Sequence, residues 1–275
     1  MNPNLHSLLA QTDSVMSGLL RSASDNGHYH GPVRVGVDLG TAYTVLLVLD
    51  QNNQPLCGEY RFAQVVRDGL VVDFVGAVDL LRQMKTRVEK RLGFALEAAA
   101  SGYPPGVPQV EVRATANVLR AAGLECTGLV DEPTAANNVL NIRDGAIVDV
   151  GGGTTGIAVF KDGKVVYTAD EPTGGTHFSL VIAGALNISF EDAEELKKQP
   201  AEQPRLFPLI RPVMEKVGSI VRRHIARRNV DAIYLVGGTC AYPGMDAVVA
   251  EYTGIKTLVP GNPLFITPLG IAMHN

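Results

Sequence analysis

The apolar positions of the chain alternate between strand-like and helical spacing. Continuous apolar runs rich in β-branched residues predict strands at 33–37, 44–50, 146–150, 157–160 and 232–236. Apolar residues at helical spacing predict helices at 76–93, 117–122, 133–141, 178–186, 191–198, 211–228, 245–251 and 264–273. Pro200, Pro204 and Pro208 are interpreted as breakers that precede the helix at 211–228. Strands that alternate with helices in this way predict an α/β fold.

One pattern occurs twice along the chain. Residues 33–50 and 146–169 both have the pattern of a β-hairpin with Asp and Gly near its turn. Each hairpin is followed by further strands and helices. The sequence therefore predicts a weak internal duplication, with two similar halves.

Residues 1–30 differ from the rest of the chain. A stripe at helical spacing predicts a short amphipathic helix, and its members are Leu5, Leu8, Leu9, Thr12, Val15, Met16, Leu19 and Leu20. A polar segment, 22–32, follows as a linker. Two interpretations stay open: a helix packed on its own domain, or a detachable peptide that docks on a partner groove or a shell protein.

Composition and charge narrow the function classes. The 275 residues include 24 basic and 28 acidic side chains, for a net charge of −4, which argues against a nucleic-acid partner. No uncharged apolar run is long enough for a membrane span, and the start lacks the pattern of a secretory signal. Cys57, Cys126 and Cys240 are widely spaced, which argues against a disulfide framework or a structural zinc site. We expect a cytoplasmic protein without a membrane partner.

Two glycine-containing turns are candidate anion sites. Asp38-Leu-Gly-Thr41 lies between two apolar strands, where backbone N–H groups and the Thr41 hydroxyl suit an anion and Asp38 suits a hydrated metal ion; an ordinary hairpin turn is the alternative. Asp149-Val-Gly-Gly-Gly-Thr-Thr155 has three consecutive glycines, more than a structural turn needs. It lacks the spacing of a P-loop and the strand-to-helix context of a dinucleotide fingerprint. This second turn predicts a phosphate-binding loop.

Two further segments are compatible with a nucleotide site. Leu235-Val-Gly-Gly-Thr-Cys240 is a strand ending in a glycine pair, which permits close contact with a base or ribose, or serves as a plain loop. Asp131-Glu-Pro-Thr-Ala-Ala136 is a good helix start, with acids before a proline. Glu132 is either a partner of the helix dipole or a group that orients water.

These four segments, in this order, resemble the signature of the actin-like ATPases, which include sugar kinases, DnaK-type chaperones and MreB-type filaments. Residues 35–41 resemble their first phosphate motif, 149–155 the second, 235–239 the adenosine motif and 131–136 the connecting-helix motif. The segments 67–74 and 193–197 are similar to MreB-type sequences. The resemblance spans about 33–273 and implies a two-lobed actin-like, ribonuclease H-like fold with a reduced upper lobe in domain II.

Within that superfamily the chain more closely resembles the EutJ family, described as chaperones encoded with ethanolamine utilisation. The match is carried by VVRDGLVVDFVGAV, Val130–Ala135, DVGGGTTGIAV and ADEPTGGTHFSL. The family implies a small DnaK-like ATP-binding domain linked to a bacterial microcompartment, with one of its enzymes or shell proteins as the partner. The implied domains are 1–30 (helix and linker), 31–144 with 263–275 (domain I) and 145–262 (domain II).

The resemblance also implies residue roles for ATP or ADP and Mg²⁺ in the cleft between the lobes. It assigns phosphate contacts to Gly40, Thr41, Gly151, Gly152, Gly153 and Thr154. It assigns ribose contacts to Glu194 and Lys197, and adenosine contacts to Gly237, Gly238 and Thr239. Asp38 and Asp149 would hold Mg²⁺ through water, and Glu132 would orient the attacking water.

Departures from the superfamily pattern weaken the expected catalysis. Ala42 stands where DnaK-type chaperones have a second Thr, Gly156 stands where many relatives have an acid, and no lysine matches the one near the γ-phosphate. We therefore expect slow or absent hydrolysis. Three functions remain open: an ATP-dependent chaperone or reactivating factor, a nucleotide-binding adaptor or scaffold without significant hydrolysis, and an MreB-like filament former. A sugar kinase is disfavoured, because a short upper lobe leaves little room for a substrate.

Overall fold

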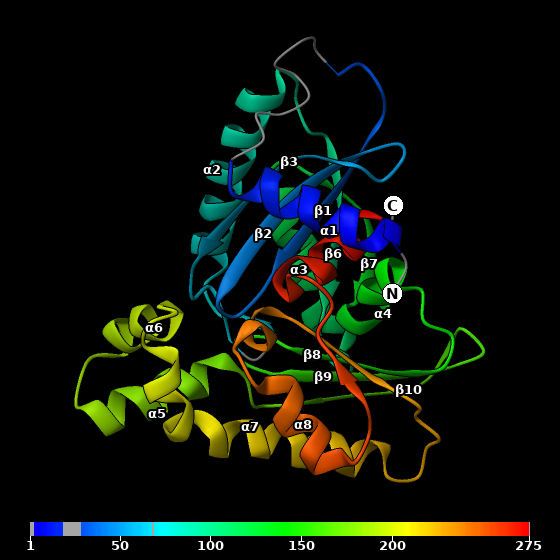
Figure 1. Ribbon diagram of the computed structural model, residues 1–275. Coiled ribbons are helices and arrows are strands. Elements are labelled where there is room, and N and C mark those ends of the chain that lie inside the picture. Colours follow the sequence, from blue (N-terminus) through cyan, green and yellow to red (C-terminus); the bar gives the residue numbers. More distant parts are fainter. Residues whose placement is uncertain (1–2, 19–28, 68, 275) are drawn as a thin grey trace. The chain divides into compact units, whose positions relative to one another are not determined.

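The computed structural model describes residues 3–18, 29–67 and 69–274 (Figure 1). The chain divides into two compact units, Met1–Asn141 with Leu264–Asn275 (unit 1) and Ile142–Pro263 (unit 2). Leu19, Leu20 and most of the expected linker lie outside the described residues. No helix in the described ranges combines the length and the apolarity that a membrane crossing requires.

Unit 1 is built on a five-stranded sheet in the order β3-β2-β1-β6-β7. Its strands are β1 (Val33–Leu39), β2 (Tyr43–Asp50), β3 (Pro55–Phe62), β6 (Ala98–Tyr103) and β7 (Glu125–Asp131), and a small hairpin is formed by β4 (Val66–Arg67) and β5 (Leu70–Val71). Its helices are α1 (Pro3–Met16), α2 (Phe74–Leu92), α3 (Gln109–Ala121), α4 (Glu132–Leu140) and α9 (Ile266–Ala272), which follows the 3₁₀ turn Pro263–Phe265. Strands β1 and β2 form the predicted hairpin, and β6 and β7 run parallel to β1.

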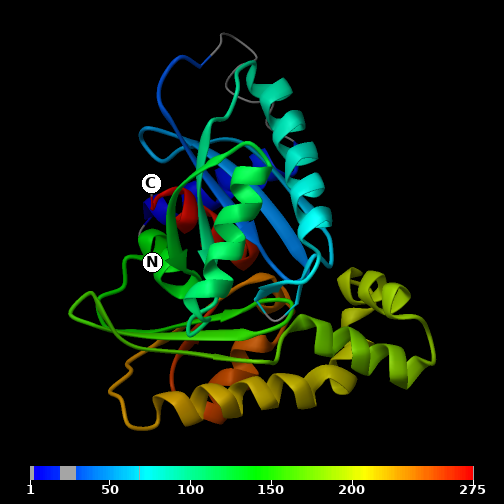
Figure 2. The ribbon, with the colours of Figure 1, turned by 180° about the vertical axis from the view of Figure 1, so that it is seen from behind.

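Helices cover both faces of this sheet. Helices α2 and α3 bury their apolar sides against one face, in a cluster that includes Val37, Leu46 and Leu81. Helix α9 packs on β1, β2 and β6, and also on α4 (Figures 1 and 2). The cluster of Ala100, Val130, Ala135 and Ile271 forms part of that second interface.

A row of mostly small residues crosses the sheet of unit 1, and α1 and α9 pack close to two of its glycines. Gly58, Leu47, Gly36, Ala100 and Gly128 are cross-strand partners in that order. A Cβ on Gly36 would lie 2.6 Å from the backbone N of Ala272 in α9, and a Cβ on Gly58 would approach the Met16 sulfur of α1. The apolar stripe of α1, with Leu5, Leu9, Val15 and Met16 buried, packs against β3. The structure therefore places this helix on its own unit, the first of the two interpretations.

Unit 2 repeats the topology of unit 1, with a sheet in the order β10-β9-β8-β11-β12. Its strands are β8 (Gly145–Val150), β9 (Thr155–Lys161), β10 (Lys164–Glu171), β11 (Ile233–Val236) and β12 (Thr257–Leu258). Its helices are α5 (Gly175–Leu186), α6 (Phe190–Lys198), α7 (Gln203–Ile225) and α8 (Met245–Thr253), with a 3₁₀ turn, η2, at Gly238–Ala241. The first three strands are antiparallel, and β11 runs parallel to β8 and β12. The duplication predicted from the two hairpins is therefore a duplication of the whole sheet order.

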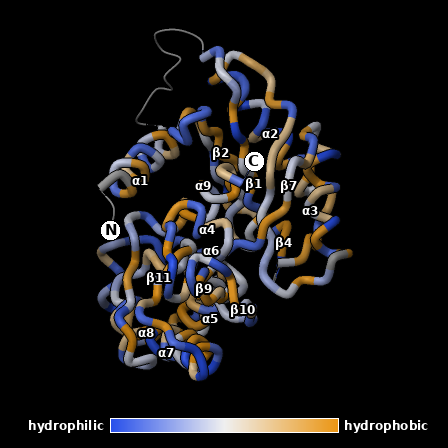
Figure 3. Tube along the Cα trace, turned by 90° about the vertical axis from the view of Figure 1, so that its right-hand side faces the viewer, coloured by the Kyte–Doolittle hydropathy of each residue, from blue (hydrophilic) through white to orange (hydrophobic). Residues whose placement is uncertain are grey.

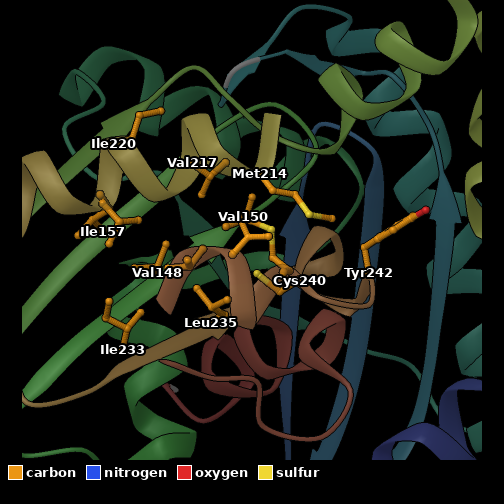
Figure 4. Packing of buried hydrophobic residues seen from close by; sticks show 14 of the residues in the cluster. Val148, Val150, Ile157, Met214, Val217, Ile220, Ile233, Leu235, Cys240 and Tyr242 are labelled. Carbon is orange, nitrogen blue, oxygen red and sulfur yellow. The ribbon is translucent and has the colours of Figure 1, made fainter. Parts of the chain in front are cut away.

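Apolar side chains of α5, α7 and α8 form the core of unit 2 against β8, β9 and β11. Figure 4 shows Val148, Val150, Ile157 and Leu235 from the strands, beside Met214 and other α7 side chains. The hydropathy colouring agrees with this placement, because β11 is mainly apolar and α7 carries both kinds of residue (Figure 3).

The expected start of the helix at 211–228 was wrong, because α7 begins at Gln203 and continues through Pro208 and Pro212. Pro204 lies in the first turn, where its missing N–H costs nothing. Pro208 and Pro212 both lie on the exposed face. The opposite face buries Leu206, Ile210, Met214, Val217 and Val221, and each side chain of this kind contributes roughly 1.5–3 kcal/mol on burial. That sum offsets the two interior prolines, at about 3 kcal/mol each.

Candidate functional site

The candidate phosphate loop of unit 2 lies where three strands end at one edge of the sheet. Strands β8 and β11 are parallel, and β10 has the same direction because two antiparallel pairings separate it from β8. Residues 151–154 follow β8, residues 172–174 follow β10, and Gly237 follows β11. The topology thus gathers the predicted second phosphate motif and the predicted adenosine motif at the same edge. Ligand sites of α/β sheets lie beyond such strand ends.

The turn at 151–154 presents backbone donors. Its ends are closed by a hydrogen bond from the N–H of Gly151 to the carbonyl of Thr154, at 3.0 Å. Within the described part of the chain, the N–H groups of Gly152, Gly153 and Thr154 donate no hydrogen bond. Successive unengaged N–H groups in a turn form a concave anion site. The geometry agrees with the phosphate role expected for these residues.

Hydrogen bonds from the first turn of α5 and from the turn η2 fix the conformation of this loop. The N–H of Gly175 donates to the carbonyl of Gly151 at 2.9 Å, and the N–H of Thr176 donates to that of Gly152 at 2.8 Å. The Thr239 hydroxyl also donates to the Gly151 carbonyl, at 2.7 Å. Two carbonyls of the loop therefore point toward α5 and η2, and the Thr239 hydroxyl has a structural role in joining the two motifs.

Glycines allow α5 and β11 to approach the loop at 151–154 and the Asp149 side chain closely. A Cβ on Gly174 would lie 2.6 Å and 2.7 Å from the carbonyl oxygens of Gly151 and Gly152. Gly237 has a φ of +88°, which favours glycine, and a Cβ there would come within 2.3 Å of an Asp149 carboxylate oxygen. These positions tolerate no side chain while the loop keeps this conformation.

Asp149 lies in β8, 6% exposed, with its carboxylate beside Gly237. Cys240 is close to it: burial raises the pKa of the Cys240 thiol well above its usual range, and the charge of Asp149 adds to the rise. Thr155 is fully buried, and its hydroxyl donates to the carbonyl of Thr173 at 2.6 Å. Among the described residues no group of three His, Cys, Asp or Glu side chains could hold a metal ion.

Glu194 and Lys197, the expected ribose contacts, form a buried ion pair on α6. The Lys197 ammonium donates to the Glu194 carboxylate at 2.6 Å, to the Ser179 hydroxyl at 2.8 Å and to the Gly175 carbonyl at 3.1 Å. The Ser179 hydroxyl also bonds the Glu194 carboxylate, at 2.5 Å. Burial lowers the pKa of Lys197, and the charge of Glu194 opposes that shift. The cluster attaches α6 to the first turn of α5.

In unit 1, the turn after β1 is a tight hairpin. The N–H of Gly40 donates to the carbonyl of Tyr43 at 3.1 Å, and the N–H of Ala63 donates to the carbonyl of Ala42. Asp38 lies in β1, half-buried, one residue before the strand ends. Thr41 is half-buried within the turn. A Cβ on Gly40 would lie 4.0 Å from Asp38 Oδ1, so the backbone of Gly40 is near the Asp38 carboxylate, and Thr41 follows it in the turn.

Glu132 lies at the start of α4, beside the last strand residues of the same sheet. The Asp131 carboxylate caps α4 by accepting the N–H of Thr134 at 3.1 Å. The Glu132 side chain lies over Gly102, where a Cβ would be 3.5 Å from its Cγ. Because β1, β6 and β7 are parallel, Asp38 and Glu132 share the edge of unit 1 at which these strands end. The two carboxylates assigned to unit 1 are therefore on one edge, as a site would need.

Two further side chains stabilise the start of α5, which supports the loop. His177 is the third residue of α5, and its Nδ1 accepts the N–H of Gly174 at 3.2 Å, so it caps the helix. Ser179 is fully buried and binds both members of the ion pair. A serine four residues after Gly175 gives no signal of its own, since its partners come from α6.

Comparisons with known proteins show which families this chain is similar to. The family model of the type IV pilus assembly protein PilM matches residues 133–266. The ethanolamine utilization protein EutJ of Salmonella typhimurium is 44% identical over 242 residues, 88% of this chain and 85% of that protein. A chaperone protein HscA homolog of Chromobacterium violaceum is 25% identical over 78% of this chain, which spans only 44% of that protein.

Solved structures show the same fold. The crystal structure of EutJ from Carboxydothermus hydrogenoformans superposes with a TM-score of 0.91 and 43% identity, and covers 99% of this chain and 98% of its own. MreB5 of Spiroplasma citri bound to AMPPNP superposes with a TM-score of 0.72 at 17% identity, over 90% of this chain and 97% of that chain. The expected two-lobed actin-like fold is confirmed by these likenesses.

Proposed function

The chain belongs to the family of the ethanolamine utilization protein EutJ, and from that premise we propose that it is a slow, Mg²⁺-dependent ATPase of the actin-like kind. We further propose that it serves as a chaperone or reactivating factor for enzymes of an ethanolamine-utilisation microcompartment. One observation carries the nucleotide part: among the described residues, the turn at 151–154, which follows the strand that carries Asp149, has three unengaged N–H groups.

The chemistry of this loop fits phosphates and a hydrated Mg²⁺. Unengaged N–H groups of Gly152, Gly153 and Thr154 suit phosphate oxygens, and the Asp149 carboxylate would accept hydrogen bonds from water bound to Mg²⁺. Bound Mg²⁺ would neutralise charge that develops on the phosphates. The turn is held rigidly by α5 and η2, so its donors need little rearrangement when an anion binds. Support also comes from a fold relative, MreB5 of Spiroplasma citri, which was solved bound to AMPPNP and to ADP.

In unit 1 we assign Gly40 and Thr41 to phosphate contact, Asp38 to water around Mg²⁺, and Glu132 to the orientation of the attacking water. Support comes from the shared edge of β1, β6 and β7, where Asp38 and Glu132 both lie. A carboxylate at a helix start can accept a proton from water, as general bases do. In unit 2 we assign adenosine contacts to the backbone of Gly237, Gly238 and Thr239, and a ribose contact to Glu194.

We propose that ATP hydrolysis is slow because two side chains of the superfamily pattern are replaced, at positions 42 and 156. Ala42 has no hydroxyl to offer a phosphate, and Gly156 has no carboxylate to position the metal ion. Phosphoryl transfer depends on positioning and electrostatics, so each missing group lowers the rate without abolishing binding.

The chaperone part of the proposal is supported by the likeness to chaperone protein HscA homologs. The link to ethanolamine utilisation is supported by the EutJ relatives. The partner would be an enzyme or a shell protein of the microcompartment, and the two proteins would bind each other in the cytoplasm. Helix α1 is packed on β3. We therefore propose that the partner binds another part of the chain, or that it binds α1 only after this helix has left β3.

Phosphate release over hours, measured on the purified full chain with MgATP, tests the proposal. We expect slow release that Asp149→Asn and Glu132→Gln abolish and that Asp144→Asn leaves unchanged, because Asp144 is a surface partner of Lys161. Nucleotide binding without release would support the adaptor alternative. An ATP-dependent rise in light scattering would support the filament alternative. Release that survives Asp149→Asn would remove the site assignment.

A further inference from the structure

Three arginine side chains of unit 1 converge on one carboxylate near the edge of the sheet. Glu59 Oε1, on β3, accepts from Nε of Arg61 and from Nε of Arg87, each at 2.7 Å. Arg91 lies 3.5 Å from the other carboxylate oxygen. We propose that this arginine cluster (Arg61, Arg87 and Arg91) and the outer edge of β3 bind an extended acidic segment of a partner protein. The proposed nucleotide site has no assigned residue on β3 or α2, so the two inferences are independent.

The cluster holds more positive charge than its carboxylate neutralises. Arg61 and Arg87 share one oxygen, and in the described part of the chain neither pairs with another carboxylate. An arginine has five N–H donors, yet the terminal Nη groups of these two donate no hydrogen bond to a described residue. The Glu59 side chain is 10% exposed, whereas those of Arg61 and Arg87 are 52% and 40% exposed. Because the whole chain has a net charge of −4, this local excess of positive charge favours an anionic partner.

Strand β3 is an edge strand, and part of its main chain faces outward. Its only neighbour in the described sheet is β2, beside which α2 also packs on β3 (Figure 1). The N–H of Ala63 donates to the carbonyl of Ala42, and this direction alternates along an antiparallel pair, so the main-chain groups of Tyr60 face away from β2. The carbonyl of Gly58, which also faces outward, accepts from Arg91 at 2.8 Å. Outward main-chain groups on an edge are a template for a further strand.

The two faces of β3 define which residues a partner strand should carry. Side chains alternate between the faces of a strand, and Glu59 and Arg61 lie on the face toward α2. Tyr60 and Phe62 lie on the opposite face, where the Tyr60 ring is 5.5 Å from that of Phe265, and they are 39% and 42% exposed. Cross-strand neighbours on one face contact each other. A segment that pairs with β3 should thus alternate acidic residues, beside the arginine cluster, with apolar residues, beside the two exposed rings.

Backbone amide NMR of the full chain, titrated with a capped hexapeptide of alternating glutamate and valine, tests this proposal. We expect chemical-shift changes at Tyr60 and Arg61, and slower solvent exchange of the Tyr60 N–H, because a paired strand protects it. Added salt should weaken binding, because it screens exposed charges. A hexapeptide of alternating lysine and valine should bind at least about tenfold more weakly, because its charge is opposite. So should one of alternating glutamate and proline, because proline cannot donate to a ladder.

Two substitutions test the arginine cluster without isolating Glu59. Arg61→Met and Arg87→Met each remove one guanidinium group and leave two arginines beside the carboxylate. Each should weaken binding of the glutamate–valine peptide by about two- to fivefold, the range of an exposed ion pair, and the double variant by about tenfold. Arg113→Met is the matched control, because it removes the same charge from α3, which packs on β7 at the opposite edge of the sheet. It should leave the affinity unchanged.

Four results would overturn the proposal. The first is no shift at Tyr60 and Arg61 at millimolar peptide, and the second is a shift without protection of the Tyr60 N–H. The third is an equal loss of affinity in Arg113→Met and Arg61→Met, which would show an effect of net charge alone. The fourth is an octathymidylate that binds at the same amides as tightly as the peptide, which would assign the surface to nucleic acid. The titration needs no nucleotide, so failure of the proposed ATPase would leave its outcome unaffected.

Discussion

Gly174 is the residue at which the loop and α5 approach most closely. Gly174→Ala would place a Cβ 2.6 Å from the carbonyl of Gly151, and both neighbours are backbone that cannot swing aside. We expect a loss of stability of about 1–3 kcal/mol, as for other overpacked sites, and a weakened hold on nucleotide. Denaturant titration and nucleotide titration measure the two effects.

Gly184 gives the matched control for that prediction, since it lies within α5 and an added Cβ meets nothing within 4 Å. Gly184→Ala should stabilise the protein by roughly 0.5–1 kcal/mol, because alanine is the better helix former. Equal effects of the two substitutions would contradict the close approach at Gly174.

At the scale of single residues, the sequence revealed the glycine-rich loops but not the side chains that fix their conformation. Three consecutive glycines at 151–153 and the pair at 237–238 indicate close backbone approach by themselves. The hydroxyl of Thr239 was expected near adenosine, yet it donates to the Gly151 carbonyl. Ser179 gave no signal, because its role depends on side chains from another helix. Contacts between elements have no local pattern from which to be read.

At the scale of elements, α7 tests how burial competes with local propensity. Pro212 has no N–H to donate to the carbonyl of residue 208, and its ring lies on the exposed face. Pro212→Ala should restore that bond and stabilise the protein by about 1–3 kcal/mol, reduced by the greater freedom of the unfolded chain. Pro204→Ala, in the first turn, should change stability by less than about 0.5 kcal/mol. Chemical denaturation of both variants measures the change in the free energy of unfolding. A loss of stability in Pro212→Ala would contradict the prediction.

A pH-dependent contact joins β10 to α7. The Glu171 carboxylate bonds His224 at 2.9 Å and Arg223 at 2.6 Å, and the His224 bond is the main cause that lowers the pKa of Glu171. A lowered carboxylate pKa stabilises the folded state above the unfolded pKa, and this contribution is lost as the pH falls through the folded pKa.

Glu171→Gln should therefore cost stability near pH 6, by at most about 1 kcal/mol because solvent screens the pair. The difference from wild type should vanish on acidification below about pH 4. Denaturant titrations over this range measure it. A difference that grows as the pH falls would contradict the assigned direction.

Element types were predictable where periodicity was strong, and boundaries were not. The hairpins at 33–50 and 146–169 are present as expected. The start of α7 was wrong because prolines were interpreted without the buried face opposite them. The sequence left the position of α1 open, because Met16 of this helix packs on Gly58, which is distant from it along the chain.

At the scale of the whole molecule, one sheet order occurs twice, β3-β2-β1-β6-β7 and β10-β9-β8-β11-β12. In both units the strands that carry Asp38 and Asp149 are central and begin a hairpin. The resemblance to actin-like ATPases implied this arrangement, and periodicity alone indicated only a repeated hairpin. The sheet order depends on pairings between distant strands, which no local pattern specifies.

The central claim is that this chain binds an adenine nucleotide with Mg²⁺, and thermal unfolding with and without MgATP and MgADP tests it most directly. A ligand that binds only the folded state raises its stability, by about 2.7 kcal/mol at a hundredfold excess over the dissociation constant. We predict a clear rise in Tm with both nucleotides in the wild-type protein, and a much smaller one in Asp149→Asn. An unchanged Tm with saturating MgATP and MgADP would contradict the account, and would leave the actin-like fold as a scaffold.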